Sequence, residues 1–389
     1  MQEDFHYYAT YCAAYIAGYT HKESLDICYS AQLVDCLTAT FLNKIKGPIM
    51  AATTQSQAEL VNAATDPIGL QNITRIWASF HFLPYDLYAK LPWRPRYYMN
   101  KYRLICKPNG KLVENTVKLA KNKGLKAAGL AMHVVADTWA HSYFAGTPSR
   151  VINNTNYYFY EIVKEDGKLQ DKQVHFKHNP AITDDVTKGI YSSSVNQERE
   201  NSIMNLGHGR AGHFPDYSFA KYKFMPAWGN YEIIEKDNPS DYFHAFSQMV
   251  YALKYLRGSA EDFTVSQYDM DALTEWKEEI SVILEKRQID ANADWKAFGE
   301  KLSGEEIPDF DINQYQKEYM DAPSDEKDKT FLGAFINAAM AQKSMVTNEI
   351  FKSGNLIAGF SIEYDFKHFK GIKDFQKLIR YQLGGDDDE

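Results

Sequence analysis

One segment of the sequence places imidazole and carboxylate side chains at a regular spacing in apolar surroundings. Residues 125–144 read LKAAGLAMHVVADTWAHSYF and contain no lysine, arginine or glutamate after Lys126. His133, Asp137 and His141 recur every four residues, so in a helix they project from one face within roughly 80°. A buried carboxylate is costly unless it is paired or binds a metal. The pattern predicts a metal-binding helix, and a hydrogen-bonded His–Asp–His ladder between helices is the alternative.

Two further candidate ligands lie near the N-terminus. His6 stands in the apolar, aromatic segment 5–18, which is expected to be a helix that ends on a glycine. Residues 20–23 (Thr-His-Lys-Glu) form a capping box that begins a helix running towards Leu42. We therefore expect Asp35 to be a second carboxylate inside an apolar helix.

The other candidates lie later in the chain. His81 ends an apolar run that stops at a proline. Segment 207–216 (GHGRAGHFPD) has glycines that allow the backbone to approach an ion closely, and it supplies three candidates: His208, His213 and Asp216. Each histidine alone could be an ordinary hydrogen-bonded core residue. Together the candidates exceed the four ligands of a structural zinc site, which favours a metal cluster.

The order of these residues resembles the ligand order of the zinc-dependent phospholipase C and P1-type nuclease superfamily. Those proteins are all-helical enzymes with a trinuclear zinc site that cleaves phosphate esters. Several phrases are similar, more closely, to an uncharacterised bacterial domain family distantly akin to that superfamily: DFHYYATY, YSAQLVD, FHFLP, HVVADTWAHSYFAG and GHGRAGHFPDY. The resemblance covers roughly residues 1–260.

The resemblance implies three metal positions. The first is held by Asp35, His81, His133 and Asp137. The second uses His141 with His208 or His213, and Asp216 is a further candidate. The third is held by His6, with Asp137 as the bridge.

The sequence departs from the superfamily pattern in two places. In the superfamily the mature N-terminal amino group is itself a ligand, whereas five residues precede His6 here, which puts the third metal in doubt. The last ligand pair is usually His-x3-Asp/Glu, but this chain reads His213-Phe-Pro-Asp216. The choice between His208 and His213 therefore stays open.

The expected activity is metal-dependent hydrolysis of a phosphate ester by a metal-bound hydroxide, because clustered divalent ions activate water and stabilise the phosphoryl transition state. Two or three ions, most simply zinc, are expected. Asp35 would bind metal and orient the nucleophile, and Arg210 would pair with a phosphate oxygen or else face solvent. The substrate would be small and phosphorylated or lipid-like.

The alternative is a non-catalytic helical protein whose metal has a structural or ligand-binding role. Other hydrolase signatures are missing from the sequence: HExxH, GxSxG and GxxxxGK[ST]. Serine-nucleophile and P-loop chemistry therefore have little support. Metal identity, substrate and oligomeric state are not fixed by the residues.

Composition and charge limit the classes of protein to which this chain can belong. The 389 residues include 51 acidic and 43 basic ones, for a net charge of −8, which argues against a dedicated nucleic-acid-binding surface. The longest apolar stretch, 129–146, contains two histidines and an aspartate, so no transmembrane segment is expected. The sequence begins without a signal peptide, so a cytoplasmic location is expected.

The periodicity predicts an all-α fold, a multi-helix bundle similar to phospholipase C and P1 nuclease, with a small β-like insertion and a helical C-terminal extension. Residues 1–260 would form the metal-binding domain, and the insertion at about 150–200 would contain strands near 157–163 and 173–176 around the turn 165–167. Residues 85–110, rich in Pro, Tyr and Arg, look like an ordered loop. Helices are expected at 111–123, 239–256, 270–287, 328–351 and 366–383. Residues 261–385 form the C-terminal region, and 386–389 are an acidic tail.

Overall fold

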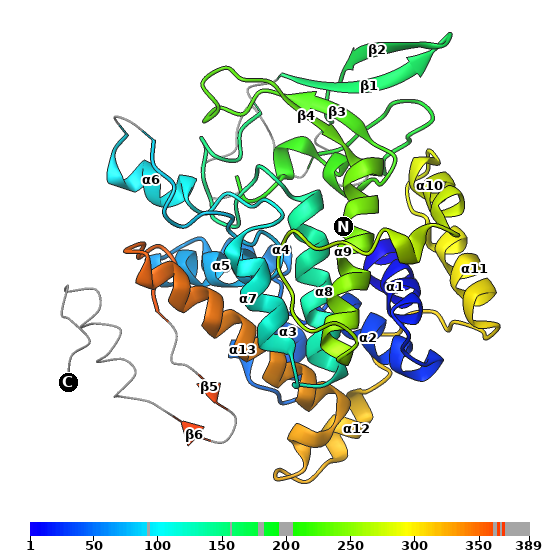
Figure 1. Cartoon of the computed structure of the whole chain (residues 1–389). Coiled ribbons are helices and arrows are strands. Elements are labelled where there is room, and N and C mark those ends of the chain that lie inside the picture. Colours follow the sequence, from blue (N-terminus) through cyan, green and yellow to red (C-terminus); the bar gives the residue numbers. More distant parts are fainter. Residues whose placement is uncertain are drawn as a thin grey trace.

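The computed structural model describes residues 1–91, 94–155, 158–177, 183–193, 205–360, 364–365 and 368–369. At its centre is helix α8 (Leu125–Ala140), which is buried over nearly its whole length. Helices α2 (His21–Leu33), α5 (Pro67–Phe80), α7 (Lys111–Ala120), α9 (Asn238–Arg257) and α13 (Phe331–Lys352) pack around it (Figure 1). An apolar sequence without a polar face suits this central position.

Shorter helices complete the helical layer. They are the π-helix η1 (Asp4–Ala9), α1 (Thr10–Ile16), α3 (Ala39–Lys44), α4 (Gln57–Ala63), α6 (Arg96–Tyr102), α10 (Lys277–Glu285), α11 (Asn292–Ser303) and α12 (Gln316–Asp321). Single 3-10 turns lie at η2 (Ile49–Ala51), η3 (Gly209–Ala211), η4 (Phe214–Asp216), η5 (Asp271–Leu273) and η6 (Lys327–Lys329). No helix in the described residues has the length and apolar character that a membrane span needs.

The prediction of an all-α fold is wrong. A four-stranded antiparallel sheet in the order β2-β1-β3-β4 makes the protein a mixed α/β structure (Figure 1). Its strands are β1 (Phe159–Glu165), β2 (Lys168–Gln173), β3 (Lys221–Phe224) and β4 (Ile234–Asp237). Strands β1 and β2 flank the predicted turn at 165–167, but β3 and β4 lie beyond the predicted insertion. They have four residues each, and β3 joins the sheet by pairing with β1 from a distant part of the chain, so no local pattern predicts them.

Two helix boundaries also differ from the predictions. Helix α2 begins with the predicted capping box of Thr20 and Glu23 but ends at Leu33. Asp35 therefore lies in the turn after α2 and not inside a helix. A new helix, α3, starts at once because the Thr38 side chain accepts a hydrogen bond from the backbone N–H of Phe41.

The C-terminal part is described incompletely. Most of the predicted helix 366–383 and all of the tail 386–389 lie outside the described residues. Residues 368–369, which that helix included, form strand β6 (His368–Phe369) against β5 (Tyr364–Asp365). Helices α10 and α13 share one hydrophobic core with the N-terminal helices. A second core of aromatic side chains lies under the sheet.

Candidate metal centre

The candidate ligands come from segments that are far apart in the sequence and meet at the C-terminal half of α8. His133 and Asp137 lie on α8 itself, and His141 is its C-cap residue. His81 is the C-cap residue of α5. His6 lies in η1, and π-helical turns of this kind occur frequently at functional sites. The segment containing η3 and η4 adds the ligands from 208–216.

Three of these side chains form a compact triangle of nitrogen and oxygen atoms. His133 Nε2 lies 3.1 Å and His81 Nδ1 lies 3.2 Å from Asp137 Oδ2. The two nitrogens are 3.3 Å apart. Asp35 Oδ1 lies slightly further out, 3.7 Å from His81 Nδ1 and 3.9 Å from His133 Nε2. Tetrahedral zinc with bonds of 2.0–2.1 Å has ligand atoms about 3.3 Å apart, so the residues present fit such an ion.

Backbone carbonyl groups fix the orientation of these rings. His133 donates its Nδ1–H to the carbonyl of Ala31 at 2.9 Å, and His81 donates its Nε2–H to the carbonyl of Thr53 at 3.0 Å. In the neutral tautomers the lone pairs of the other ring nitrogens therefore point at each other and at Asp137. Burial alone would lower the pKa of His81, but Asp137 and Asp35 outweigh it and raise that pKa, so either a proton on its Nδ1 or a bound cation would offset the repulsion. Rings held in this way by backbone carbonyls are the usual environment of metal-binding histidines.

His6 extends the triangle on the far side of Asp137. Its ring stacks on His133 with centroids 3.7 Å apart, and its Nε2 lies 3.1 Å from Asp137 Oδ1 and 3.9 Å from Asp35 Oδ2. The side chain is completely buried, yet neither ring nitrogen has a well-oriented hydrogen bond within the described structure. Burial, followed by the neighbouring His133, lowers the pKa of His6 to about 4. The ring is therefore neutral and offers a lone pair to a cation.

A second group of candidate ligands lies one turn further along α8, around His141. His141 Nε2 is 3.1 Å from Asp216 Oδ1, and His208 Nε2 is 3.4 Å from Asp216 Oδ2. The outer nitrogens again donate to backbone carbonyls, His141 Nδ1 to His81 at 2.7 Å and His208 Nδ1 to Gly212 at 2.8 Å. Burial lowers the pKa of His208 to about 4.

Three groups of side chains in the described residues can each hold a metal ion: Asp35, His81 and His133; His6, His133 and Asp137; and His141, His208 and Asp216. Asp137 lies between the groups. Burial alone would raise the pKa of Asp137, but His141, the Met1 ammonium and His133 outweigh it and hold the pKa well below its usual value. Asp137 is thus an ionised carboxylate beside the Met1 ammonium, and it is placed to bridge two ions.

The nitrogen of Met1 lies between the first two groups and the third. It donates to Asp137 Oδ1 at 2.8 Å and lies 3.1 Å from His141 Nε2 and 3.3 Å from Asp216 Oδ1. The residues before His6 thus do not keep this nitrogen away from the site, because the Gln2 carbonyl accepts hydrogen bonds from the Phe5 and His6 N–H groups and the chain before His6 is compact. In this structure a positive charge occupies the gap between the two carboxylates.

Two sequence candidates stand apart from these groups. The side chain of His213 is 56 % exposed, and its Nδ1 is 3.6 Å from Asp216 Oδ2, so the geometry favours His208 as the ligand. Arg210 is 9 % exposed and donates from Nε to Asn205 Oδ1 at 2.7 Å. No carboxylate in the described part of the chain forms an ion pair with Arg210.

Several supporting groups carry no recognisable sequence signal. Phe82 stacks on His141 with ring centroids 4.7 Å apart. The buried Lys236 of β4 donates to the carbonyl of Trp139 at 2.8 Å and to Ser142 Oγ at 2.7 Å, which stabilises the C-terminal end of α8. The carbonyl groups that orient the histidines belong to the backbone, so only the fold reveals them.

The ligand side chains of the centre differ in their exposure to solvent. Those of His6, His133 and Asp137 are at most 1 % exposed, whereas that of Asp35 is 31 % exposed. His208 and Asp216 are partly accessible, at 16 % and 10 %. Asp35 is therefore the carboxylate of the three groups that solvent reaches most readily.

Comparisons with known proteins place the chain in a family but give no function. A search of curated proteins and a search of solved structures found no match. The sequence model of a family of unknown function, DUF6765, matches residues 1–350. The match covers both the centre and the C-terminal helices up to α13, and the chain therefore belongs to this family.

Proposed function

We propose that this protein is a metal-dependent hydrolase that uses two or three divalent ions, most simply zinc, to cleave a phosphate ester. The observation that carries the proposal is the triangle of His133 Nε2, His81 Nδ1 and Asp137 Oδ2, whose edges are 3.1 to 3.3 Å. Both rings are turned towards Asp137 by backbone carbonyls. A divalent cation would relieve the repulsion between these atoms.

The order of the ligands supports a catalytic centre. It resembles that of the zinc-dependent phospholipase C and P1-type nuclease superfamily, and we propose a distant kinship on that ground. When bound, the ions would acidify water and neutralise phosphate charge.

The chain's own residues would position the substrate. Asp35 is the most exposed carboxylate of the three groups, so water and substrate would approach from its side, where it can orient the attacking water. Arg210 is a buried cation without a carboxylate partner in the described structure. A bidentate contact with phosphate oxygens would engage its two terminal guanidinium nitrogens, for which the described residues supply no hydrogen-bond acceptor.

The test is hydrolysis by the zinc-loaded full-length protein of p-nitrophenyl phosphate, bis(p-nitrophenyl) phosphate and p-nitrophenylphosphorylcholine. We expect turnover of at least one of them. Arg210→Met should raise KM without changing the metal content, and His175→Ala, an exposed histidine outside the centre, should behave like the wild type. Full metal loading without hydrolysis of any phosphate ester would contradict the proposal and favour a non-catalytic metal-binding protein.

A further inference from the structure

Residues 85–107 carry a concentration of positive charge that is unusual for this acidic protein. The segment contains one acidic residue, Asp86, and six basic ones: Lys90, Arg94, Arg96, Lys101, Arg103 and Lys107. None of the six forms an ion pair in the described parts of the chain. Lys101, Arg103 and Arg96 instead donate to the backbone carbonyls of Pro148, Ala89 and Gly354. In the described residues these six side chains therefore have no direct ionic partner.

The exposed tyrosines gather in the same region. The protein has 27 tyrosines, and most of those described are at least partly buried. Four are exposed in the described residues: Tyr85 (45 %), Tyr88 (59 %), Tyr97 (69 %) and Tyr231 (84 %). Three of them belong to the segment 85–107, and the fourth lies in the loop between β3 and β4.

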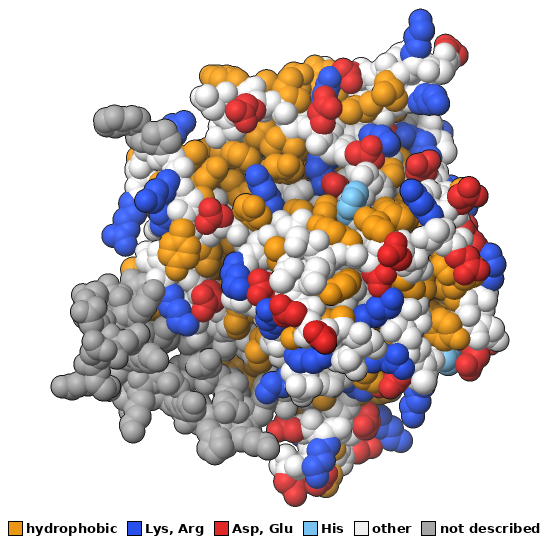
Figure 2. All heavy atoms as spheres, viewed as in Figure 1, with side chains coloured by type: hydrophobic (Ala, Val, Ile, Leu, Met, Phe, Trp, Pro, Cys, Tyr) orange, Lys and Arg blue, Asp and Glu red, His pale blue; other side chains and the backbone are white. Residues whose placement is uncertain are grey.

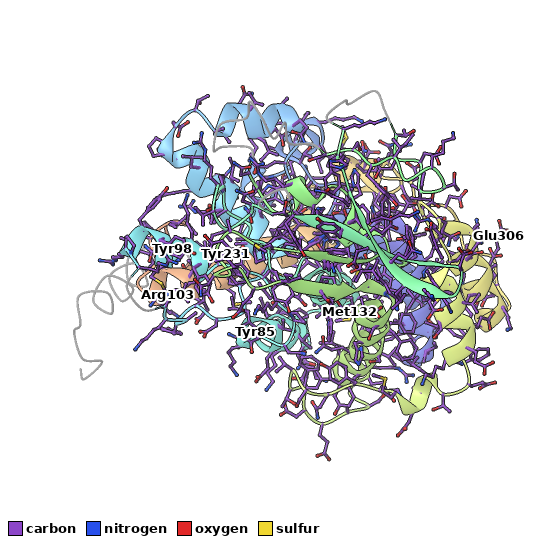
Figure 3. The ribbon with its side chains drawn as sticks, turned by 90° about the horizontal axis from the view of Figure 1, so that it is seen from above. Tyr85, Tyr98, Arg103, Met132, Tyr231 and Glu306 are labelled. Atoms are coloured by element: carbon purple, nitrogen blue, oxygen red, sulfur yellow. The ribbon has the colours of Figure 1, made fainter. Side chains whose placement is uncertain are left out.

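A contact between two aromatic rings joins the β3–β4 loop to the segment 85–107. Tyr102 of α6 meets Trp228 with centroids 5.7 Å apart. Seen from above, Tyr98, Tyr231 and Arg103 lie near one another at one side of the molecule, with Tyr85 beyond them (Figure 3). Basic and apolar side chains are mixed on the surface over and around α6 (Figure 2). We call residues 85–91, 94–107 and 228–233 the basic aromatic surface; its loop adds one acidic residue, Glu232.

The backbone displays Tyr231 at a conformational cost. Asn230 and Tyr231 have φ values of 52° and 68°, a left-handed conformation that a tyrosine adopts rarely. The two residues are the central pair of a turn that joins β3 and β4, closed by the hydrogen bond from the Glu232 N–H to the Gly229 carbonyl at 2.9 Å. This turn leaves the Tyr231 side chain 84 % exposed.

We infer that the basic aromatic surface binds the face of an anionic lipid bilayer. Tyrosine rings are stable at the level of lipid headgroups because one end is apolar and the other polar. Lysine and arginine near such a surface are attracted to anionic lipids.

The experiment is co-sedimentation of the full-length protein with vesicles. We expect binding to phosphatidylcholine vesicles that contain phosphatidylglycerol, weak binding to pure phosphatidylcholine vesicles, and a decline as salt is added. The triple variant Lys90→Ser, Arg94→Ser, Arg96→Ser should weaken binding by about 100-fold. Tyr97→Ser with Tyr231→Ser should weaken it by about tenfold or more.

A matched control removes the same charge elsewhere. Lys22, Lys277 and Lys317 are exposed and lie outside the basic aromatic surface, so their triple serine variant should bind vesicles like the wild type. Equal loss in both triple variants would overturn the inference, because it would show a response to net charge alone. Binding of a single-stranded oligonucleotide without binding of anionic vesicles would also overturn it. Thermal melting of each variant checks that the fold is intact.

Discussion

His133 and His81 face each other across 3.3 Å through nitrogen atoms that carry no proton in the neutral rings. Each ring donates one N–H to a backbone carbonyl, His133 to Ala31 and His81 to Thr53. Because Asp137 completes the triangle with a carboxylate oxygen, three acceptors converge on one point. This relationship is the basis of the metal assignment.

Replacing one of these three ligand side chains should weaken metal binding. We expect His133→Ala to lower zinc affinity by more than about 100-fold, since His133 belongs to two of the three groups and loss of an orienting partner alone costs 10- to 100-fold. Isothermal titration with zinc measures the change. His175→Ala is the control, and equal zinc affinity of the two variants would contradict the assignment.

We expect only one of the two histidines in the 207–216 segment to bind metal. His208 is partly buried with Nε2 turned to Asp216, whereas the His213 side chain is 56 % exposed. We therefore expect His208→Ala to lose about one equivalent of metal and His213→Ala to keep the wild-type content. Elemental analysis of both purified variants decides between them, and the reverse result would make His213 the ligand.

The close approach of α2 to α8 should depend on Gly129. A Cβ atom at this position would lie 2.1 Å from the carbonyl oxygen of Ile27, so the helices would have to separate. Gly129→Ala should reduce the free energy of unfolding by about 1–3 kcal/mol. It should also weaken zinc binding, because Ala31 on α2 orients His133. Urea unfolding tests the first effect, and an unchanged midpoint would show that the packing is looser than the structure implies.

Stability should depend on pH through Lys343 of α13. Burial, followed by the nearby Arg75, lowers the pKa of Lys343 from 10.5 to about 7. Between these values the unfolded chain binds more protons than the folded one, so this residue makes stability rise with pH from about 7 to 10.5. Below pH 7 its destabilising effect is complete.

Lys343→Met should remove this dependence. The variant should gain stability relative to the wild type near pH 6, and the gain should shrink as pH rises to 10. Urea unfolding of both proteins at several pH values measures the difference. A constant difference would show that Lys343 is charged in both states throughout.

The sequence predicted the parts of the centre that local patterns encode. The spacing of His133 and Asp137 on an apolar helix is a local signal, and α8 places both as expected. Asp35 was expected inside a helix, yet α2 ends at Leu33 and the turn makes Asp35 the accessible carboxylate. A helix that ends within an apolar stretch is difficult to foresee from periodicity.

Features that depend on distant pairing were not predictable. Strand β3 pairs with β1 across more than fifty residues of chain, and its KYKF sequence is too short to predict a strand. The carbonyl groups of Thr53 and Gly212 accept from histidines only because the fold brings them there. The lack of direct ionic partners for the six cations of segment 85–107 in the described residues also needed the structure, since pairing of those cations cannot be read from composition.

The metal content of the full-length protein, purified without chelators and loaded with zinc, tests the central claim most directly. Elemental analysis should give at least two equivalents per chain. A crystal collected at the zinc absorption edge should show anomalous peaks between Asp137 and the His81/His133 pair and between His141, His208 and Asp216. One equivalent or none, or peaks away from α8, would contradict a metal cluster built on His133 and Asp137.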